Sequence, residues 1–131
     1  MILLDTHIWL NWVILGEDAL PAGIREAVAG AEQLGVSAIS CFEVTLLARR
    51  GRVLLSCEPE EWLQKALAPS GVECLPITCE IARRAVELPE HHRDPADRLI
   101  IATPLHYSAK LASVDSLIGQ YTELSNALLS S

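Results

Sequence analysis

Short apolar runs that alternate with helical segments constrain the fold of this chain more than any other feature. The first run, Ile2-Leu3-Leu4, is too short for a helix and too continuous for a half-exposed strand, so it predicts an inner strand of a parallel sheet. Further strands are expected over residues 35–39, 72–76 and 111–114. Strands that alternate with helices predict an α/β fold with a central, mainly parallel sheet and helices on both faces.

Helices are expected between these strands, over residues 6–14, 21–31, 40–50, 59–68, 78–88 and 95–109. Gly51 is suited to end the third of them, and Thr78 is suited to cap the fifth. Pro104 falls inside the last helix and removes a backbone hydrogen bond there, so we expect a bend or an early end. The tail, residues 121–131, is expected to form a weak edge strand or a frayed end.

Length and charge limit the possible functions. The chain has 131 residues, half of them hydrophobic, which predicts one globular domain with a substantial core. The formal net charge of −7 argues against coating of nucleic acid by bulk electrostatics, but it does not exclude an RNA substrate for an acidic, metal-recruiting site. Positive residues cluster at Arg49-Arg50 with Arg52, at Arg83-Arg84, and at Arg93 with Arg98. The first and last clusters are either solvated helix ends or guides for a phosphate backbone.

The four cysteines, Cys41, Cys57, Cys74 and Cys79, have neither zinc-site spacing nor a redox C-x-x-C motif. We therefore expect reduced and mostly buried thiols. Asp5 interrupts the first apolar run and no basic leader precedes it, so no signal peptide is expected. The apolar stretch from Ile8 to Leu15 is too short to span a bilayer, so a cytoplasmic protein without membrane contact is expected.

Acidic residues lie at the edge of the predicted sheet where open α/β proteins bind their ligands. Asp5 and Asp115 each end an apolar run, and Glu43 lies in the first turn of the helix after the second strand. Asp94 and Asp97 open the helix that follows them. Because the carboxyl ends of parallel strands and the amino ends of the next helices share one edge, these acids should converge.

Each acid taken alone also has a structural explanation. Ser40 and Glu43 match a capping box, and Asp94 followed by proline matches a helix N-cap. The convergence favours a site, because two like charges about 4 Å apart repel by roughly 4 kcal/mol at an effective dielectric near 20. Several carboxylates in one crevice therefore need a trapped proton or a cation, and the cation is the simpler answer. All-oxygen donors without a companion histidine or cysteine set favour Mg²⁺ or Mn²⁺ over zinc.

Four motifs in this order resemble the PIN-domain ribonucleases, most closely the VapC-like toxins of bacterial and archaeal toxin–antitoxin pairs. They are Leu3-Leu4-Asp5-Thr6-His7, Ser40-x-x-Glu43-Val44, Arg93-Asp94-Pro95-Ala96-Asp97-Arg98-Leu99-Ile100-Ile101-Ala102, and Leu111-Ala112-Ser113-Val114-Asp115. Together they cover almost the whole chain. There are two departures from the family pattern: Pro104 stands where the family usually has alanine, and no clear closing hydrophobic strand follows Asp115.

The resemblance implies a PIN-like three-layer α/β/α sandwich and a metal-dependent endoribonuclease. Its acidic quartet would be Asp5, Glu43, Asp97 and Asp115, with Asp94 as an additional acid and Mg²⁺ or Mn²⁺ as the cofactor. The resemblance also implies a homodimer and a cognate VapB-like antitoxin whose peptide lies in a groove near the site. We expect the antitoxin tail to inhibit by inserting an arginine or lysine among the acids.

Within this site, Asp5 and Asp97 are the candidates for direct metal coordination, with Asp115 and Glu43 holding waters or a second ion. Thr6 and Ser113 either support these acids through their hydroxyls or only cap local structure.

The histidines and tryptophans are not expected to bind the metal or the substrate directly. His7 is expected to pack beside Asp5 or to support it, and His91, His92 and His106 share no ligand spacing. Trp9 and Trp12 lie on one helical face and, with Trp62, are expected to be core or interface residues rather than base-stacking platforms.

Three other classes of function remain open at this stage. A phosphoacceptor signalling domain would want a pair of early acids and a late lysine, and Lys110 lies on the wrong side of Asp115. A phosphatase of the haloacid dehalogenase type would want a second aspartate where this chain has His7. A catalytically inactive PIN domain that only binds a partner would retain the fold, and an assay is needed to separate it from a nuclease.

Overall fold

The apolar runs form a five-stranded sheet in the computed structural model, which describes residues Met1–Ser131. The strand order is β3-β2-β1-β4-β5, and every neighbouring pair is parallel. The strands are β1 (Ile2–Leu4), β2 (Leu34–Ser37), β3 (Val72–Leu75), β4 (Lys110–Ala112) and β5 (Leu128–Leu129). The predicted parallel sheet is thus confirmed, with β1 at its centre.

Six α-helices connect and cover these strands: α1 (Thr6–Leu15), α2 (Ala22–Gly30), α3 (Ala38–Arg49), α4 (Pro59–Ala66), α5 (Cys79–Glu87) and α6 (Pro95–Tyr107). Short 3₁₀ turns lie at Glu17–Ala19, Ala68–Ser70, Ile118–Gln120 and Thr122–Leu124. Thr78 caps α5 as expected, because its hydroxyl accepts a hydrogen bond from the Ile81 amide at 3.2 Å.

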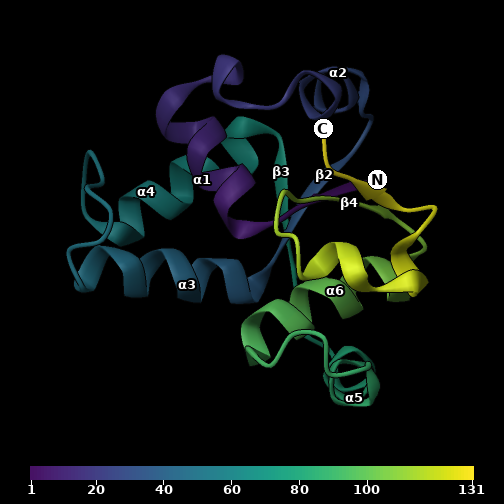
Figure 1. Ribbon diagram of the computed structural model, residues 1–131. Coiled ribbons are helices and arrows are strands. Elements are labelled where there is room, and N and C mark those ends of the chain that lie inside the picture. Colours follow the sequence, from purple (N-terminus) through teal and green to yellow (C-terminus); the bar gives the residue numbers. More distant parts are fainter.

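Two hydrophobic cores lie on opposite faces of the sheet, as the alternation of side chains along a strand requires. Ile2 and Leu4 pack on the face covered by α1, α2 and α4, whereas Leu3 packs on the other face against α6 and the C-terminal segment. Helix α5 packs on the outer side of α6 through Ile81 and Ala102. Figure 1 shows the sheet between these two groups of helices, so the predicted three-layer α/β/α sandwich is confirmed.

Trp9 anchors the first core. Its side chain is fully buried, its indole Nε1 donates to the Ala66 carbonyl at 3.1 Å, and its ring meets Trp62 edge-on at 5.3 Å. Trp12 is half-buried beside the same core. The prediction that these rings are packing residues is confirmed for Trp9 and Trp62, and Trp9 has no surface left for a partner.

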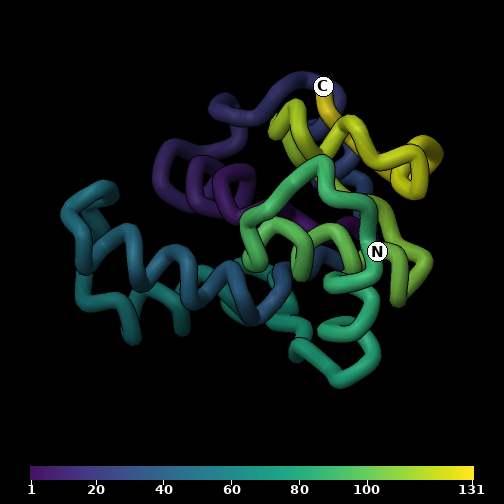
Figure 2. Tube along the Cα trace, turned by 60° about the horizontal axis from the view of Figure 1, so that its bottom comes forward, coloured from purple at the N-terminus to yellow at the C-terminus, as the bar shows by residue number.

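Helix α3 and the loop after it form an arm that extends away from the sheet, and α4 runs back along this arm to the first core (Figures 1 and 2). Helix α3 ends as predicted before Gly51, whose φ of +69° favours glycine. At the end of the arm, Leu54 is almost entirely exposed.

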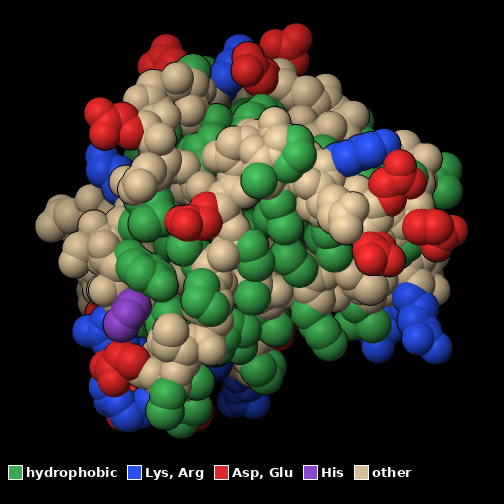
Figure 3. Space-filling model, turned by 180° about the vertical axis from the view of Figure 1, so that it is seen from behind, with side chains coloured by type: hydrophobic (Ala, Val, Ile, Leu, Met, Phe, Trp, Pro, Cys, Tyr) green, Lys and Arg blue, Asp and Glu red, His purple; other side chains and the backbone are tan.

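Figure 3 shows the molecule from behind the view of Figure 1. On this face, hydrophobic side chains gather in the middle and most charged side chains lie toward the periphery. No helix is long and apolar enough to cross a membrane.

Two features near the C-terminus bear on alternatives that the sequence left open. Pro104 does not end α6, which continues through Tyr107 before Ser108 closes it at a φ of +52°. The tail supplies β5, which pairs in parallel with β4 through Leu128 and Leu129. Of the two alternatives for the tail, a weak edge strand or a frayed end, the structure shows the edge strand, which is only two residues long.

Candidate active site

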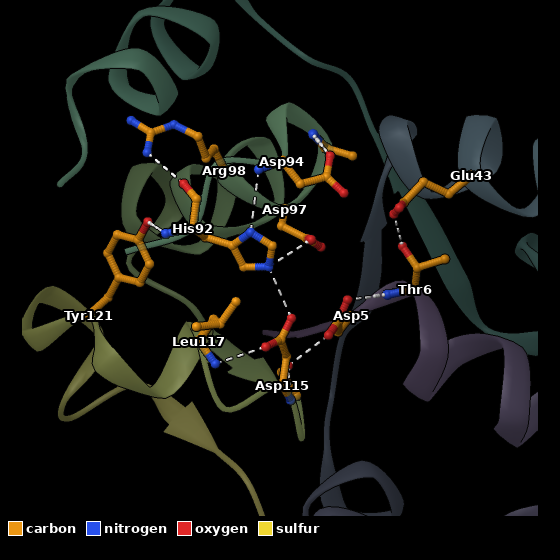
Figure 4. Close-up of polar contacts among 12 residues, drawn as sticks. Asp5, Thr6, Glu43, His92, Asp94, Asp97, Arg98, Asp115, Leu117 and Tyr121 are labelled. Atoms are coloured by element: carbon orange, nitrogen blue, oxygen red, sulfur yellow. Dashed lines mark hydrogen bonds and ion pairs between the residues drawn. The ribbon is translucent and has the colours of Figure 1, made fainter. Parts of the chain in front are cut away.

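Five carboxylates meet at the edge of the sheet where the parallel strands end (Figure 4). Asp5 directly follows β1, Asp115 follows β4, and Glu43 comes from α3. Asp94 and Asp97 come from the start of α6. Ligand oxygens of Glu43, Asp94 and Asp97 lie within 4.8 Å of one another, and those of Asp97 and Asp115 lie within the same distance of a His92 ring nitrogen. Asp97 thus belongs to both groups.

Asp5 is held by hydrogen bonds to both carboxylate oxygens. Its Oδ1 accepts from the Thr6 amide at 2.7 Å, and its Oδ2 accepts from the Ser113 hydroxyl at 2.7 Å. The Ser113 hydroxyl also accepts from the Asp115 amide at 3.1 Å, which connects Asp5 to the chain after β4. Only 5% of Asp5 is exposed, so these two donors stabilise a carboxylate that water reaches poorly.

Glu43 is held by Thr6 and has no capping role. The Thr6 hydroxyl donates to Glu43 Oε1 at 2.6 Å and lies 2.7 Å from the Ser40 hydroxyl. Helix α3 begins two residues earlier than expected, and Ser37 caps it by accepting from the Ile39 amide at 3.2 Å. The capping box suggested for Ser40 and Glu43 was therefore wrong, and both side chains point to Thr6.

Asp94 combines both of the roles suggested for it. Its Oδ1 accepts from the Ala96 amide at 3.0 Å, as an N-cap before the first-turn proline should. The same exposed carboxylate lies within 4.8 Å of the Glu43 and Asp97 oxygens. Asp94 can therefore cap the helix and still contribute a carboxylate oxygen to the acidic group.

His92 bridges two of the acids, and the sequence reasoning missed it. Its Nε2 lies 2.9 Å from Asp97 Oδ2 and 3.2 Å from Asp115 Oδ2, with only 11% of the side chain exposed. The Asp94 amide approaches His92 Nδ1 at 3.4 Å, which favours the tautomer that carries its proton on Nε2. His92 then donates toward both carboxylates. No spacing in the sequence marks it as a site residue.

The loop that carries His92 is fixed by Arg98 and Tyr121. The Arg98 guanidinium donates to four backbone carbonyls, those of Val86, Leu88, Pro89 and His92, at 2.7 to 3.0 Å. The Tyr121 hydroxyl accepts from the His92 amide at 3.0 Å and donates to the Pro89 carbonyl at 2.8 Å. Arg98 thus uses these donors to hold the loop, and the guiding of a phosphate backbone by this cluster stays a prediction for the exposed Arg93.

His7 also differs from its expected place. It is exposed rather than packed beside Asp5. Burial is the largest effect on the pKa of Asp5 and of Glu43 and raises both, and a positive charge on His7 would lower them by a smaller amount.

Burial, with a smaller contribution from neighbouring acids, raises the pKa values of three of these acids, Asp5, Glu43 and Asp97. Burial raises the pKa of Asp97 to about 7, with further increases from Asp94, Glu43 and Asp5 and an opposing effect of His92. Burial likewise raises the pKa of Asp5 and of Glu43, in each case against hydrogen bonds that favour the carboxylate. Ionising these three acids together is therefore unfavourable without a compensating positive charge, and a bound cation would supply that charge.

Comparison with known proteins agrees with this architecture. The PIN domain family matches residues 2–124. The chain is also 36% identical over 115 residues to a protein named ribonuclease VapC22 from Mycobacterium tuberculosis, covering 87% of this chain and 86% of that protein.

Solved structures share the fold. VapBC2 from Rickettsia felis, bound to a promoter DNA fragment, superposes with a TM-score of 0.69 at 18% identity and covers 98% of both chains. A toxin–antitoxin complex from Klebsiella pneumoniae superposes with a TM-score of 0.65 at 20% identity, covering 98% of this chain and 96% of that one. With the family match spanning nearly every residue, the chain belongs to the PIN domain family.

Proposed function

We propose that this chain is a divalent-metal-dependent endoribonuclease and the toxin of a VapBC-type toxin–antitoxin pair. The observation that carries the proposal is the meeting of Asp5, Glu43, Asp94, Asp97 and Asp115 at one edge of the parallel sheet. The 36% identical relative is named as a ribonuclease, which supports RNA as the substrate. Toxin–antitoxin complexes among the structural neighbours support a VapB-like antitoxin as the partner, and the family resemblance supports a homodimer.

The donor set fits Mg²⁺ or Mn²⁺. Carboxylate oxygens are hard ligands, and a bound cation would offset the burial and the neighbouring acids that raise the pKa of Asp97. Asp5 and Asp97 are the proposed direct ligands, and Asp94, Glu43 and Asp115 complete the set. When bound, a divalent ion would supply an activated water and screen the charge of the phosphodiester.

The protein's own groups orient the site for this chemistry. Ser113 and the Thr6 amide direct the two oxygens of Asp5, and the Thr6 hydroxyl directs Glu43. The Leu117 amide donates to Asp115 Oδ1 at 2.9 Å and leaves Oδ2 facing His92. Asp97, with a pKa of about 7, holds a proton for part of the time at neutral pH and would release it as positive charge arrives.

The test is cleavage of a labelled single-stranded RNA by the purified chain, freed of any partner. We expect cleavage with Mg²⁺ or Mn²⁺, loss of cleavage with excess EDTA, and at least a hundredfold lower rate for Asp97→Asn. Asp18→Asn is the matched control, because Asp18 is an exposed acid in the 3₁₀ turn after α1. Undiminished cleavage in EDTA would refute the metal dependence. Failure of the wild-type chain to cleave any RNA with metal present would instead favour a PIN domain that only binds a partner.

A further inference from the structure

Two thiols lie in contact at the β3 edge of the sheet, in a place that the proposed nuclease activity does not use. Cys41 is in the first turns of α3, and Cys74 is on β3, the edge strand of the sheet. Their sulfur atoms are 4.0 Å apart, and they are the only cysteines that contact each other in this way. From the sequence we expected mostly buried thiols. This was wrong, because Cys74 and Cys79 are exposed and Cys41 and Cys57 are half-buried.

We propose that Cys41 and Cys74 form a reversible disulfide when the protein meets a hydroperoxide. A disulfide needs the two sulfurs to approach to roughly 2 Å, and rotation of one side chain about its Cα–Cβ bond can supply this movement from van der Waals contact. The two residues come from different elements on one edge of the fold, so the bond would connect α3 to β3. Neither the family match nor the acidic site requires it.

The reaction balances with one peroxide. The exposed Cys74 sulfur attacks a peroxide oxygen, the O–O bond breaks, and a sulfenic acid forms with release of one water from hydrogen peroxide. The Cys41 sulfur then attacks the Cys74 sulfur, the S–O bond breaks, and the hydroxyl leaves as a second water with the thiol proton. Two thiols are oxidised by two electrons, and a dithiol reductant restores them by exchange.

The position of Cys41 gives the bond a structural consequence. Cys41 lies between Ser40 and Glu43, the two α3 side chains that meet the Thr6 hydroxyl, and its carbonyl accepts from the Thr45 hydroxyl at 2.8 Å. A link from Cys41 to β3 would restrain this part of α3. It would also close a segment with a sequence separation of 33 residues, which restricts the unfolded chain and raises the melting temperature.

The experiment treats the folded chain with one equivalent of hydrogen peroxide, counts free thiols with a chromogenic disulfide, and maps unreduced tryptic peptides. We expect the four thiols of the chain to fall to two and residues 26–49 to be linked to residues 66–83. Because Cys79 lies in the same tryptic peptide as Cys74, Cys79→Ser is the matched control and should keep the link. Cys41→Ser and Cys74→Ser should each abolish it.

Thermal unfolding provides a readout in the wild-type chain that does not depend on any variant. The oxidised protein should melt several degrees higher than the reduced one, and dithiothreitol should reverse the difference. Retention of four free thiols, a link that involves Cys57 or Cys79, a link between two chains, or an unchanged melting temperature would each overturn the proposal.

Discussion

Replacing Asp97 by asparagine should stabilise the metal-free protein at neutral and alkaline pH while removing activity. Burial raises the pKa of Asp97 from 3.8 to about 7, so the folded state binds this proton more tightly than the unfolded state does. The folded state is then stabilised below pH about 4, and this contribution is lost as pH rises toward 7. Asparagine keeps an oxygen that can accept a hydrogen bond from His92, but it does not ionise. The loss of stability that ionisation of Asp97 causes between pH about 4 and 7 should therefore be absent in the variant.

The magnitude follows from the shift. About three pKa units correspond to at most about 4 kcal/mol of unfolding free energy at 1.36 kcal/mol per unit. The side chain is 17% exposed, and neighbouring acids share the repulsion, so we expect a net difference of about 1 to 4 kcal/mol between wild type and variant at pH 8. Asp5 and Glu43 also have raised pKa values, so some dependence on pH should remain in the variant.

Urea unfolding at pH 5 and pH 8 in EDTA measures this directly, with Asp18→Asn as the control for charge removal at an exposed position. The wild type should lose more stability than Asp97→Asn between the two pH values, and the control should follow the wild type. Parallel pH profiles for wild type and Asp97→Asn would refute the argument that burial raises the pKa of Asp97 in the folded state.

Three further predictions test separate contacts. His92→Ala should raise the pKa of Asp97 still further, because His92 lowers it, and ¹³C NMR titration of the carboxyl should show this; an unchanged titration would remove His92 from the electrostatics of the site. Thr6→Val should lower the unfolding free energy by about 1 to 2 kcal/mol in urea titrations, because Ser40 and Glu43 lose their shared partner; no change would show that the contact is not stabilising. Added Mg²⁺ should restore cleavage by the antitoxin complex if a basic side chain of the tail occupies the acidic site, whereas inhibition insensitive to metal would place the block elsewhere.

The sheet and the acids at its edge could be predicted because both follow from local pattern. Ile2-Leu3-Leu4 is buried on both faces, and a charged residue directly after such a strand has no packing role. Asp5 could therefore be placed from its neighbours alone. In a parallel sheet, the carboxyl ends of the strands and the amino ends of the helices that follow them share one edge, and this places the other acids beside Asp5.

The start of α3 was misplaced because two serines compete for the same cap. Ser37 and Ser40 both precede an apolar segment, and only tertiary contact with Thr6 decides that Ser40 lies inside the helix. The short edge strand β5 could not be predicted with equal certainty. It has only two residues, Leu128 and Leu129, and the alternation of apolar and polar residues that marks a strand needs a longer segment.

His92 was missed because its role depends on contacts that no spacing reveals. The loop before α6 has no regular pattern, and its course is set by Arg98 from within the helix and by Tyr121 from the C-terminal segment. A histidine that approaches two acids 5 and 23 residues away can be recognised only once these segments are folded together.

The central claim, that the acids at the end of the sheet form one metal centre, is tested most directly by Mn²⁺ binding to the purified chain. Electron paramagnetic resonance follows the loss of the free-ion signal, independently of any RNA. We predict that wild type and Asp18→Asn bind Mn²⁺ equally and that Asp97→Asn binds at least tenfold more weakly, because Asp97 belongs to both groups of ligand oxygens. Equal Mn²⁺ affinity for Asp97→Asn and wild type would contradict the account.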